Sequence, residues 1–552
     1  MKLLSRILPS EEDEDKRLDR PEPQDEPVTE VHTGSWWGWT VAVAALAATP
    51  RLLYLFVFTD PENPGNGLYG DVWHHWQIAY LTKQIGVSAP DGPRLWDLKG
   101  LDYFWGVLHP VLMVALFDIT GSIDIVLGRL LSLTFGVATV VLLFKICRQH
   151  WGTQAGAGVA LVASLVPTSV MNDASGMLEP LGIALCLAAI WAWTRGNGIW
   201  AGLAFGLATM ARAEAWIFSL GMVGAAQLSR TGSKQRTPLV IAFVGVLVIY
   251  MVLLLNKTGN PIYPVWWNFL ANGTGAWGTG ITADQIVVRP ALGLILLAAL
   301  IGLGWTLWKR PASYMLLTYG FGYWIFVAVM FGFTSFLSTW LWWTPISRRF
   351  EFPLLFAGVL VTVALLSSAP RRYGTRVVPL TWAAFGALLV SSQLAWIPIV
   401  NAFGPTEVGW QRTLAESRQL GTWYSEQPFS GHALALPADR PDITYGLARF
   451  GGVDGTHLVS EMYDPFSYLP SGYRFEDHQS TVTTLVECWL SATDIRMIAI
   501  PQNDPNYALL QQLNPTWFVH LGFLDEAGWT VMGISAPRPT ASECKAARSA
   551  TQ

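Results

Sequence analysis

The stretch WWGWTVAVAALAATPRLLYLFVF, from Trp36 to Phe58, decides the class of fold. It is an apolar run of roughly the 17–25 residues that cross the hydrocarbon core of a bilayer as a helix. Similar runs recur along the 552-residue chain, of which 52% is hydrophobic and 13% charged. An average soluble protein carries about 25% charged residues. The sequence therefore predicts a polytopic membrane protein, mainly α-helical.

Hydropathy read over a window of bilayer length predicts about eleven spans in a helical bundle. An apolar segment from Val107 to Ile119, between the first and second spans, is a candidate surface helix instead. The predicted spans are 36–58, 125–147, 155–171, 178–194, 199–211, 214–228, 238–255, 291–308, 312–333, 350–367 and 377–397.

Composition divides the chain into three parts. Residues 1–35 are charged and predict a disordered tail, and residues 36–397 form the transmembrane domain, whose first loop is 59–104. Residues 398–552 return to ordinary charge and short alternating runs, which predict a soluble α/β or α+β domain. Buried strands are expected at Ile495–Pro501 and His432–Ala438. Cys488 and Cys544 in this part could pair as a disulfide or stay as free thiols.

Basic residues gather in alternate connections of the predicted spans. By the positive-inside rule these connections and the N-terminal tail are cytoplasmic, in a plasma-membrane protein. The loops with Asp71, Asp173 and Asp284 then share the outer face with the C-terminal domain, which is extracellular or periplasmic. The basic residues are Lys2, Arg6, Lys16, Arg17, Arg20, Arg148, Arg195, Arg230, Lys234, Arg236, Lys309, Arg310, Arg371, Arg372 and Arg376.

The first loop contains GDVWHHW, Gly70 to Trp76. In a helix, Asp71, His74 and His75 lie on one face at i, i+3 and i+4. A carboxylate beside imidazoles can hold a divalent cation or abstract a proton. The alternative is an interfacial helix that Trp73 and Trp76 anchor at the level of the lipid headgroups.

A second acidic cluster occurs in NDASGMLEP, Asn172 to Pro180, a turn between two spans. Asp173 and Glu179 flank the turn, on the same side of the membrane as Asp71. Pro180 suits the first turn of the next helix, and there Glu179 would complement the helix dipole. The dipole alone does not explain two acids in one turn, so both are candidate site residues.

Two arginine motifs are candidates for binding a phosphate. ARAEAW places Arg212 and Glu214 at the outer end of a hairpin, where they could form an ion pair or Arg212 could reach an anion. RRFEFP places Arg348 and Arg349 at the outer start of a late span, against the positive-inside tendency. An anionic lipid or pyrophosphate would account for this exception, and so would snorkelling at the interface.

Several of these segments resemble the GT-C superfamily of integral-membrane glycosyltransferases. GDVWHHWQIAYLTKQIG is similar to the first-loop signature of oligosaccharyltransferase catalytic subunits, and NDASGMLEPLGIAL to their second-loop element. The resemblance implies a donor linked to polyprenyl phosphate and inverting transfer, with Glu179 in the place of a metal-binding aspartate. The chain departs from the family in having no Trp-Trp-Asp run after residue 400, the element that reads the acceptor sequon in those subunits.

The function expected from this sequence is transfer of a sugar or glycan from a polyprenyl-phosphate-linked donor to a glycan, lipid or protein acceptor at the outer face. Asp71 is the expected base or acceptor-positioning acid, and Asp173 and Glu179 contact metal or acceptor. A divalent cation, Mg²⁺ or Mn²⁺, would be held by Asp71, Glu179, His74 and His75, with a metal-independent variant left open. Arg348, Arg349 and Arg212 would bind the donor phosphate.

Two other classes of function are alternatives to a glycosyltransferase. A transporter or flippase would show internal repeats and charges at the bilayer midplane, and a non-catalytic GT-C-like assembly subunit would keep the fold without the activity. The net charge of −4 argues against nucleic-acid binding.

Overall fold

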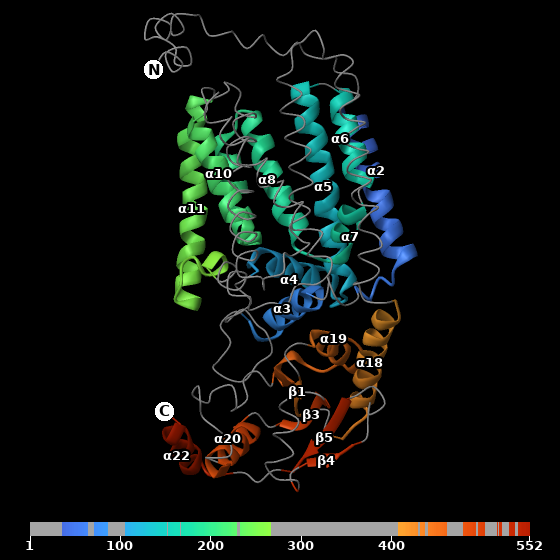
Figure 1. Cartoon of the computed structure of the whole chain (residues 1–552), viewed down its shortest axis with the longest axis vertical. Helices are drawn as coiled ribbons and strands as arrows, with labels where there is room; N and C mark the ends of the chain where they lie inside the picture. Colours follow the sequence, from blue (N-terminus) through green and yellow to red (C-terminus); the bar gives the residue numbers. More distant parts are fainter. Residues whose placement is uncertain are drawn as a thin grey trace, which may run out of the picture.

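The computed structural model has a helical bundle at one end of the molecule and a mixed sheet with helices at the other (Figure 1). All statements below concern the residues that the structure describes. These are residues 36–64, 71–86, 105–151, 153–165, 167–228, 232–266, 407–428, 431–436, 440–460, 479–492, 495–502, 516, 518–521, 529–535 and 539–551.

Within these residues, three helices are long and apolar enough to cross a membrane: Trp37–Phe58, Val126–Gln149 and Ser233–Thr258. A fourth span is added if the bent pair near residues 156–175 counts as one. The expected spans between 291 and 397 lie outside the described residues, so the count of eleven stays a prediction. The elements of the bundle are α2 Trp36–Leu53, η2 Tyr54–Phe58, α3 Asp71–Ile85, α4 Leu108–Thr120, α5 Val126–Trp151, α6 Thr153–Leu165, α7 Pro167–Ser175, α8 Glu179–Thr194, α9 Gly198–Ala211, α10 Glu214–Leu228 and α11 Ser233–Thr258.

The span expected over residues 155–171 is not one straight helix. It consists of α6 and α7, which meet at a bend of 65°. Pro167 begins α7, and a proline disfavours helical backbone at the residue before it while supplying no N–H of its own. The bend places Asp173, near the end of α7, at the end of the bundle where α3 lies.

Helices α9 and α11 pack closely because three glycines line one side of α9. A Cβ at Gly198, Gly202 or Gly206 would lie 2.3–2.5 Å from an atom of α11. The i, i+4 spacing puts these residues on one face, and small residues allow backbones to approach closely in membrane bundles. The connections with basic residues that the structure describes meet at one end of the bundle, where α9 and α11 begin. There the Gln149 side chain donates to the Thr194 carbonyl, and Gly196 lies beside Gln235.

Helices α3 and α4 lie across the opposite end of the bundle, between it and the C-terminal region, defined as residues 407–551 (Figure 1). This region contains a five-stranded sheet in the order β2-β1-β3-β5-β4, in which β2, β1 and β3 are parallel and the last two pairs antiparallel. Its elements are α18 Glu407–Ser425, β1 Ala433–Leu436, α19 Pro441–Gly451, η8 Gly455–His457, β2 Leu458–Ser460, α20 Gln479–Ala492, β3 Ile495–Pro501, β4 Phe518–His520, β5 Trp529–Ile534 and α22 Ala541–Thr551.

Two sequence predictions for this region are confirmed. Strand β3 covers Ile495–Pro501 as expected, and β1 lies inside the predicted strand 432–438. Of the two alternatives for the cysteines, the structure has the disulfide between Cys488 and Cys544, which joins α20 to α22.

Candidate functional site

The GDVWHHW motif opens α3, which confirms that Asp71, His74 and His75 lie on one helical face. Asp71 is the first residue of the helix and is half-buried. Trp73 and Trp76, in contrast, are 1% and 0% exposed. The two indoles pack inside the protein, and this excludes the alternative in which they anchor the helix at the level of the lipid headgroups.

The two histidines of the motif contact aromatic rings. The His74 and His75 rings lie 5.8 and 5.1 Å from the Trp105 ring, measured between centroids. His75 also lies 5.6 Å from His109, near the start of α4. Burial lowers the pKa of His109 to about 4, so its ring is neutral at physiological pH. The two histidines of the motif therefore form an aromatic and imidazole cluster with Trp105 and His109. The cluster is defined as His74, His75, Trp105 and His109.

Asp173 is fully buried and ion-paired to Arg51 of α2. The Arg51 Nε and Nη2 atoms donate to the same Asp173 oxygen at 2.8 and 2.6 Å. Gly136 of α5 leaves room for this carboxylate, because a Cβ there would lie 2.3 Å from it. A buried carboxylate is stable as an anion only with such a partner. In this arrangement Asp173 ties α7 to α2, a role that the sequence analysis did not foresee.

Glu179 begins α8 beside Pro180, as the sequence predicts. Its carboxylate is 2.9 Å from the guanidinium of Arg212, the residue that follows the last residue of α9. The side chain of Glu179 is 3% exposed and that of Arg212 is 15% exposed. The hairpin ion pair considered for Arg212 thus has Glu179 as its acid, whereas the side chain of Glu214 lies outside the described residues.

Arg129 of α5 joins the start of the first loop to the end of α7. Its guanidinium donates to the carbonyls of Asp60 at 2.7 Å, Pro61 at 3.0 Å and Ala174 at 2.9 Å. The residue is 1% exposed. This buried arginine thus satisfies two loop carbonyls and one carbonyl of the last turn of α7, which has no partner within the helix.

The turn between α7 and α8 packs directly on α3. Gly176, at φ +101°, approaches Val72 and Arg129 so closely that a Cβ would lie 2.8 Å from Val72. Met177 packs with the Trp73 and Trp76 cluster. Asp71, the Glu179–Arg212 pair and the aromatic and imidazole cluster therefore gather at the end of the bundle that faces the C-terminal region, and we take them as the candidate site.

The described residues do not gather a metal site. No group of three or more His, Cys, Asp or Glu side chains within them is close enough to hold an ion. Arg348, Arg349 and Asp284 lie outside the described part of the chain, so their predicted roles stay predictions. Arg51 and Arg129 are not among the site residues predicted from the sequence. The available signal was a lone arginine within an apolar span, which usually faces a partner inside the bundle.

No protein-family model and no curated protein matches the chain. Among solved structures it resembles the oligosaccharyltransferase of Archaeoglobus fulgidus tethered with an acceptor peptide containing the NVT sequon, at 13% identity and a TM-score of 0.46 over 92% of this chain and 76% of that one. The same organism's oligosaccharyltransferase AglB, in complex with an inhibitory peptide and a dolichol-phosphate, is similar at 13% identity and a TM-score of 0.42 over 91% and 75%.

The chain also resembles ArnT from Cupriavidus metallidurans bound to undecaprenyl phosphate, at 13% identity and a TM-score of 0.46 over 91% of this chain and 99% of that one. At TM-scores under 0.5 these likenesses assign neither a substrate nor a site residue to this chain.

Proposed function

We propose that this protein is a membrane glycosyltransferase that transfers a sugar or glycan from a polyprenyl-phosphate-linked donor to an acceptor at the outer face of the membrane. The observation that carries the proposal is the placement of Asp71. This half-buried carboxylate begins α3 at the bundle end that also holds the Glu179–Arg212 pair. An acid and a phosphate-binding cation near one another are what such a transfer needs.

Asp71 is assigned to the acceptor hydroxyl. The N-terminus of a helix favours the ionised carboxylate, which is the form that accepts a proton. As the acceptor oxygen attacks the anomeric carbon, the bond from that carbon to the phosphate oxygen breaks, and the hydroxyl proton passes to Asp71. Such a base must lie within hydrogen-bond reach of the hydroxyl, and attack from the face opposite the phosphate inverts the anomeric centre.

Arginine is assigned to the departing phosphate. The planar guanidinium of Arg212 has the geometry that binds phosphate oxygens in pairs, and Glu179 fixes its position at 2.9 Å. Arg348 and Arg349 share this assignment as predictions from the sequence. Charge that develops on the leaving group is stabilised most strongly by cations already in place.

A bound Mg²⁺ or Mn²⁺ stays a prediction, and no step here depends on it. The described carboxylates Asp173 and Glu179 are each paired with an arginine, and no three candidate ligands converge within the described ranges. These residues by themselves therefore do not fit a three-ligand metal site.

The test is a transfer assay with the purified full-length chain in nanodiscs, using a labelled pool of polyprenyl-phosphate sugars extracted from membranes. Transfer of label to an acceptor, at a rate set by the protein, is the expected result. Movement of labelled donor across sealed proteoliposomes without transfer would instead show a flippase. If the protein shows neither transfer nor movement of the donor, the result favours the non-catalytic assembly subunit.

A further inference from the structure

Helix α19 of the C-terminal region packs on the face of α3 that carries Trp73 and Trp76. The Tyr445 ring of α19 lies 5.2 Å from the Trp73 ring and 4.9 Å from the Trp76 ring, measured between centroids. Tyr445 is itself fully buried, in the same hydrophobic cluster as Met113 and Phe117 of α4. The two tryptophans that flank His74 and His75 are therefore held by a residue more than three hundred positions later in the chain.

Buried hydrogen bonds continue this contact along α3. Gln77 Nε2 donates to the Thr444 hydroxyl at 2.9 Å, and the Tyr80 hydroxyl donates to the Val453 carbonyl at 2.9 Å. Burial, together with the charge of Asp454, raises the pKa of Tyr80 to about 12, so this hydroxyl stays protonated as a donor. These directional bonds fix the register of α3 on the C-terminal region, which apolar packing alone would not do.

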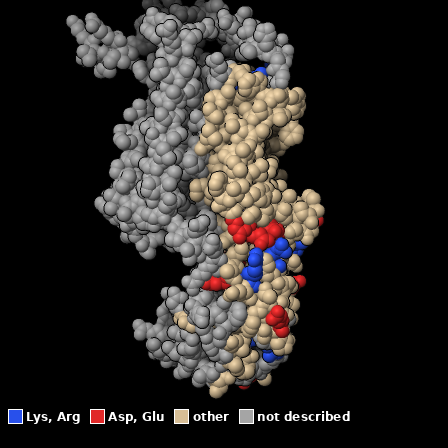
Figure 2. Space-filling model, turned by 90° about the vertical axis from the view of Figure 1, so that its right-hand side faces the viewer, with Lys and Arg blue, Asp and Glu red and all other residues tan. Residues whose placement is uncertain are grey.

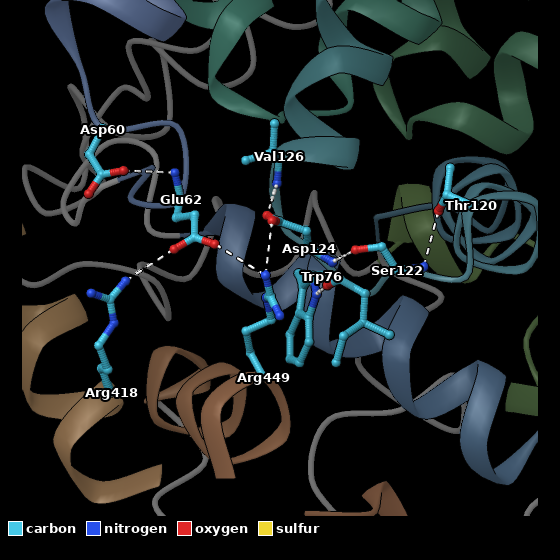
Figure 3. Close-up of polar contacts among 10 residues, drawn as sticks. Asp60, Glu62, Trp76, Thr120, Ser122, Asp124, Val126, Arg418 and Arg449 are labelled. Atoms are coloured by element: carbon cyan, nitrogen blue, oxygen red, sulfur yellow. Dashed lines mark hydrogen bonds and ion pairs between the residues drawn. The ribbon is translucent and has the colours of Figure 1, made fainter. Parts of the chain in front are cut away.

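Charged side chains cross the same junction at its edge, where Figure 2 shows acidic and basic groups side by side. Arg449 of α19 lies 3.5 Å from Glu62 of the first loop and 3.6 Å from Asp124, just before α5. Arg418 of α18 lies 3.1 Å from the other oxygen of Glu62. In Figure 3 the Arg449 guanidinium stands between the two carboxylates and contacts both. We name this group of four side chains the junction cluster.

The two acids of the junction cluster repel each other. Burial and the neighbouring charge of Asp124 raise the pKa of Glu62, against the opposite effect of Arg449 and Arg418. Asp124 also caps α5 by accepting from the Val126 N–H at 2.9 Å, so it cannot turn away without exposing that group. Arg418 neutralises Glu62 alone, whereas Arg449 contacts both acids and so keeps the two adjacent carboxylates compatible with a closed junction.

We propose that Arg449 and Tyr445 are positioning residues, through which the C-terminal region holds α3 and so fixes Asp71 against the Glu179–Arg212 pair. The inference rests on the proposed function, because it concerns the geometry of that same site. Neither residue touches the reacting atoms. Tyr445 acts through Trp73 and Trp76, which lie within two helical turns of Asp71. Arg449 acts through Glu62 of the first loop and through Asp124, next to the Ile123 carbonyl that accepts from the Trp76 indole.

The first test compares variants of the junction cluster in the transfer assay. In Arg449→Gln, kcat should fall by about 10–100-fold, the scale for a catalytic group displaced by roughly 1 Å, while the KM for the donor should change little. Adding Glu62→Gln to Arg449→Gln should restore most of the rate, because it removes the repulsion. Lys83→Gln is the matched control: it breaks an exposed ion pair between α3 and Asp118 of α4 and should leave transfer unchanged.

The second test locks the junction covalently. A Cβ on Gly455 would lie 3.0 Å from the Cβ of Gln84, and a small outward shift would reach the roughly 3.5–4.5 Å of a disulfide. In Gln84→Cys/Gly455→Cys the cross-link should form readily and leave transfer intact. When Arg449→Gln is added to this cysteine pair, oxidation should proceed several-fold more slowly. Once oxidised, the protein should recover the kcat of the unmodified chain, whereas the reduced protein should stay slow.

Two outcomes would overturn the inference. If the cysteine pair oxidises as fast with Arg449→Gln as without it, the junction does not depend on Arg449, whether or not the protein transfers sugar. If the oxidised cysteine pair with Arg449→Gln transfers as slowly as the reduced protein, closure does not set the rate. Absence of transfer in every protein, with the expected oxidation rates, would instead count against the proposed function alone.

Discussion

Two arginine–carboxylate systems of the described structure, one inside the bundle and one at the junction cluster, differ in burial. Arg51 and Asp173, inside the bundle, are 1% and 0% exposed and lie 2.6 Å apart. Arg449 and its acids, at the junction cluster, are 37%, 26% and 22% exposed at distances of 3.5 and 3.6 Å. A buried pair becomes costly when one partner is removed, whereas an exposed pair is worth little on its own. The first system should therefore determine whether the bundle folds, and the second where α3 lies within a folded protein.

The largest expected effect is on stability and concerns the buried pair. Arg51→Met leaves the Asp173 carboxylate buried without its cation, which should lower the free energy of unfolding by about 3–5 kcal/mol. Thermal unfolding in detergent measures it. The double variant Arg51→Met/Asp173→Leu should recover most of the loss, since replacing both charges by apolar groups is often neutral. A double variant as unstable as the single one would mean that Arg51 matters for packing rather than for charge.

The next effect concerns donor binding by arginines that the structure does not describe. If Arg348 or Arg349 binds the donor phosphate, its replacement by Ala should weaken donor use by about 1.5–3 kcal/mol, the scale of a hydrogen bond to a charged group. Lys should rescue only in part, because a point charge lacks the paired donors of a guanidinium. Donor titrations of the transfer rate measure this, with acceptor affinity as the internal control.

Arg212 is the candidate for donor binding whose side chain the structure describes. Because it is paired with the buried Glu179, its replacement by Ala should weaken both donor use and stability. If neither Arg212 nor the Arg348–Arg349 pair affects donor binding, the assembly-subunit alternative becomes the better account.

The smallest effect is the pH dependence of the junction cluster. Its acid Glu62 has a pKa raised above 4.5 by burial first and by Asp124 second, so the closed junction favours the protonated form. The contribution of Glu62 to closure is then fully present below 4.5 and is lost as pH rises through the raised pKa. Asp124, Arg449 and Arg418 are the charged groups that face it.

Limited proteolysis at the junction measures this dependence. Acidification from neutral pH towards 4.5 should protect Arg449→Gln more than the unmodified chain, because the repulsion between the two acids is then relieved. Adding Glu62→Gln to Arg449→Gln should remove this difference in protection. If the unmodified chain, Arg449→Gln and the double variant are equally protected at every pH, Glu62 and Asp124 do not govern closure of the junction.

Much of the local structure could be predicted from the sequence, because it follows from periodicity and end signals. The first span, the Pro180 start of α8 and the strand Ile495–Pro501 all appear where expected. Each depends on neighbours in the sequence: apolar runs of bilayer length, a proline that suits the first turn, or an alternating β-branched run.

Contacts between distant residues could not be predicted in this way. Arg51 lies 122 residues from Asp173, and Gln77 lies 367 residues from Thr444. Nothing local in either motif specifies the partner. The sequence left open that the tryptophans of GDVWHHW anchor the helix at the lipid headgroups, and their burial, with Tyr445 of the C-terminal region packed on both, excludes it.

If Asp71 serves transfer rather than folding, its amide variant should separate the two properties. Asp71→Asn keeps the size of a half-buried side chain at the start of α3, so the unfolding temperature should hardly change. The transfer rate should fall by about 10²-fold or more, as expected when a general base is removed. Asp118→Asn, an exposed acid on α4, should leave both unchanged. Near-normal transfer by Asp71→Asn, with the control unaffected, would contradict the account and leave GDVWHHW as a docking helix alone.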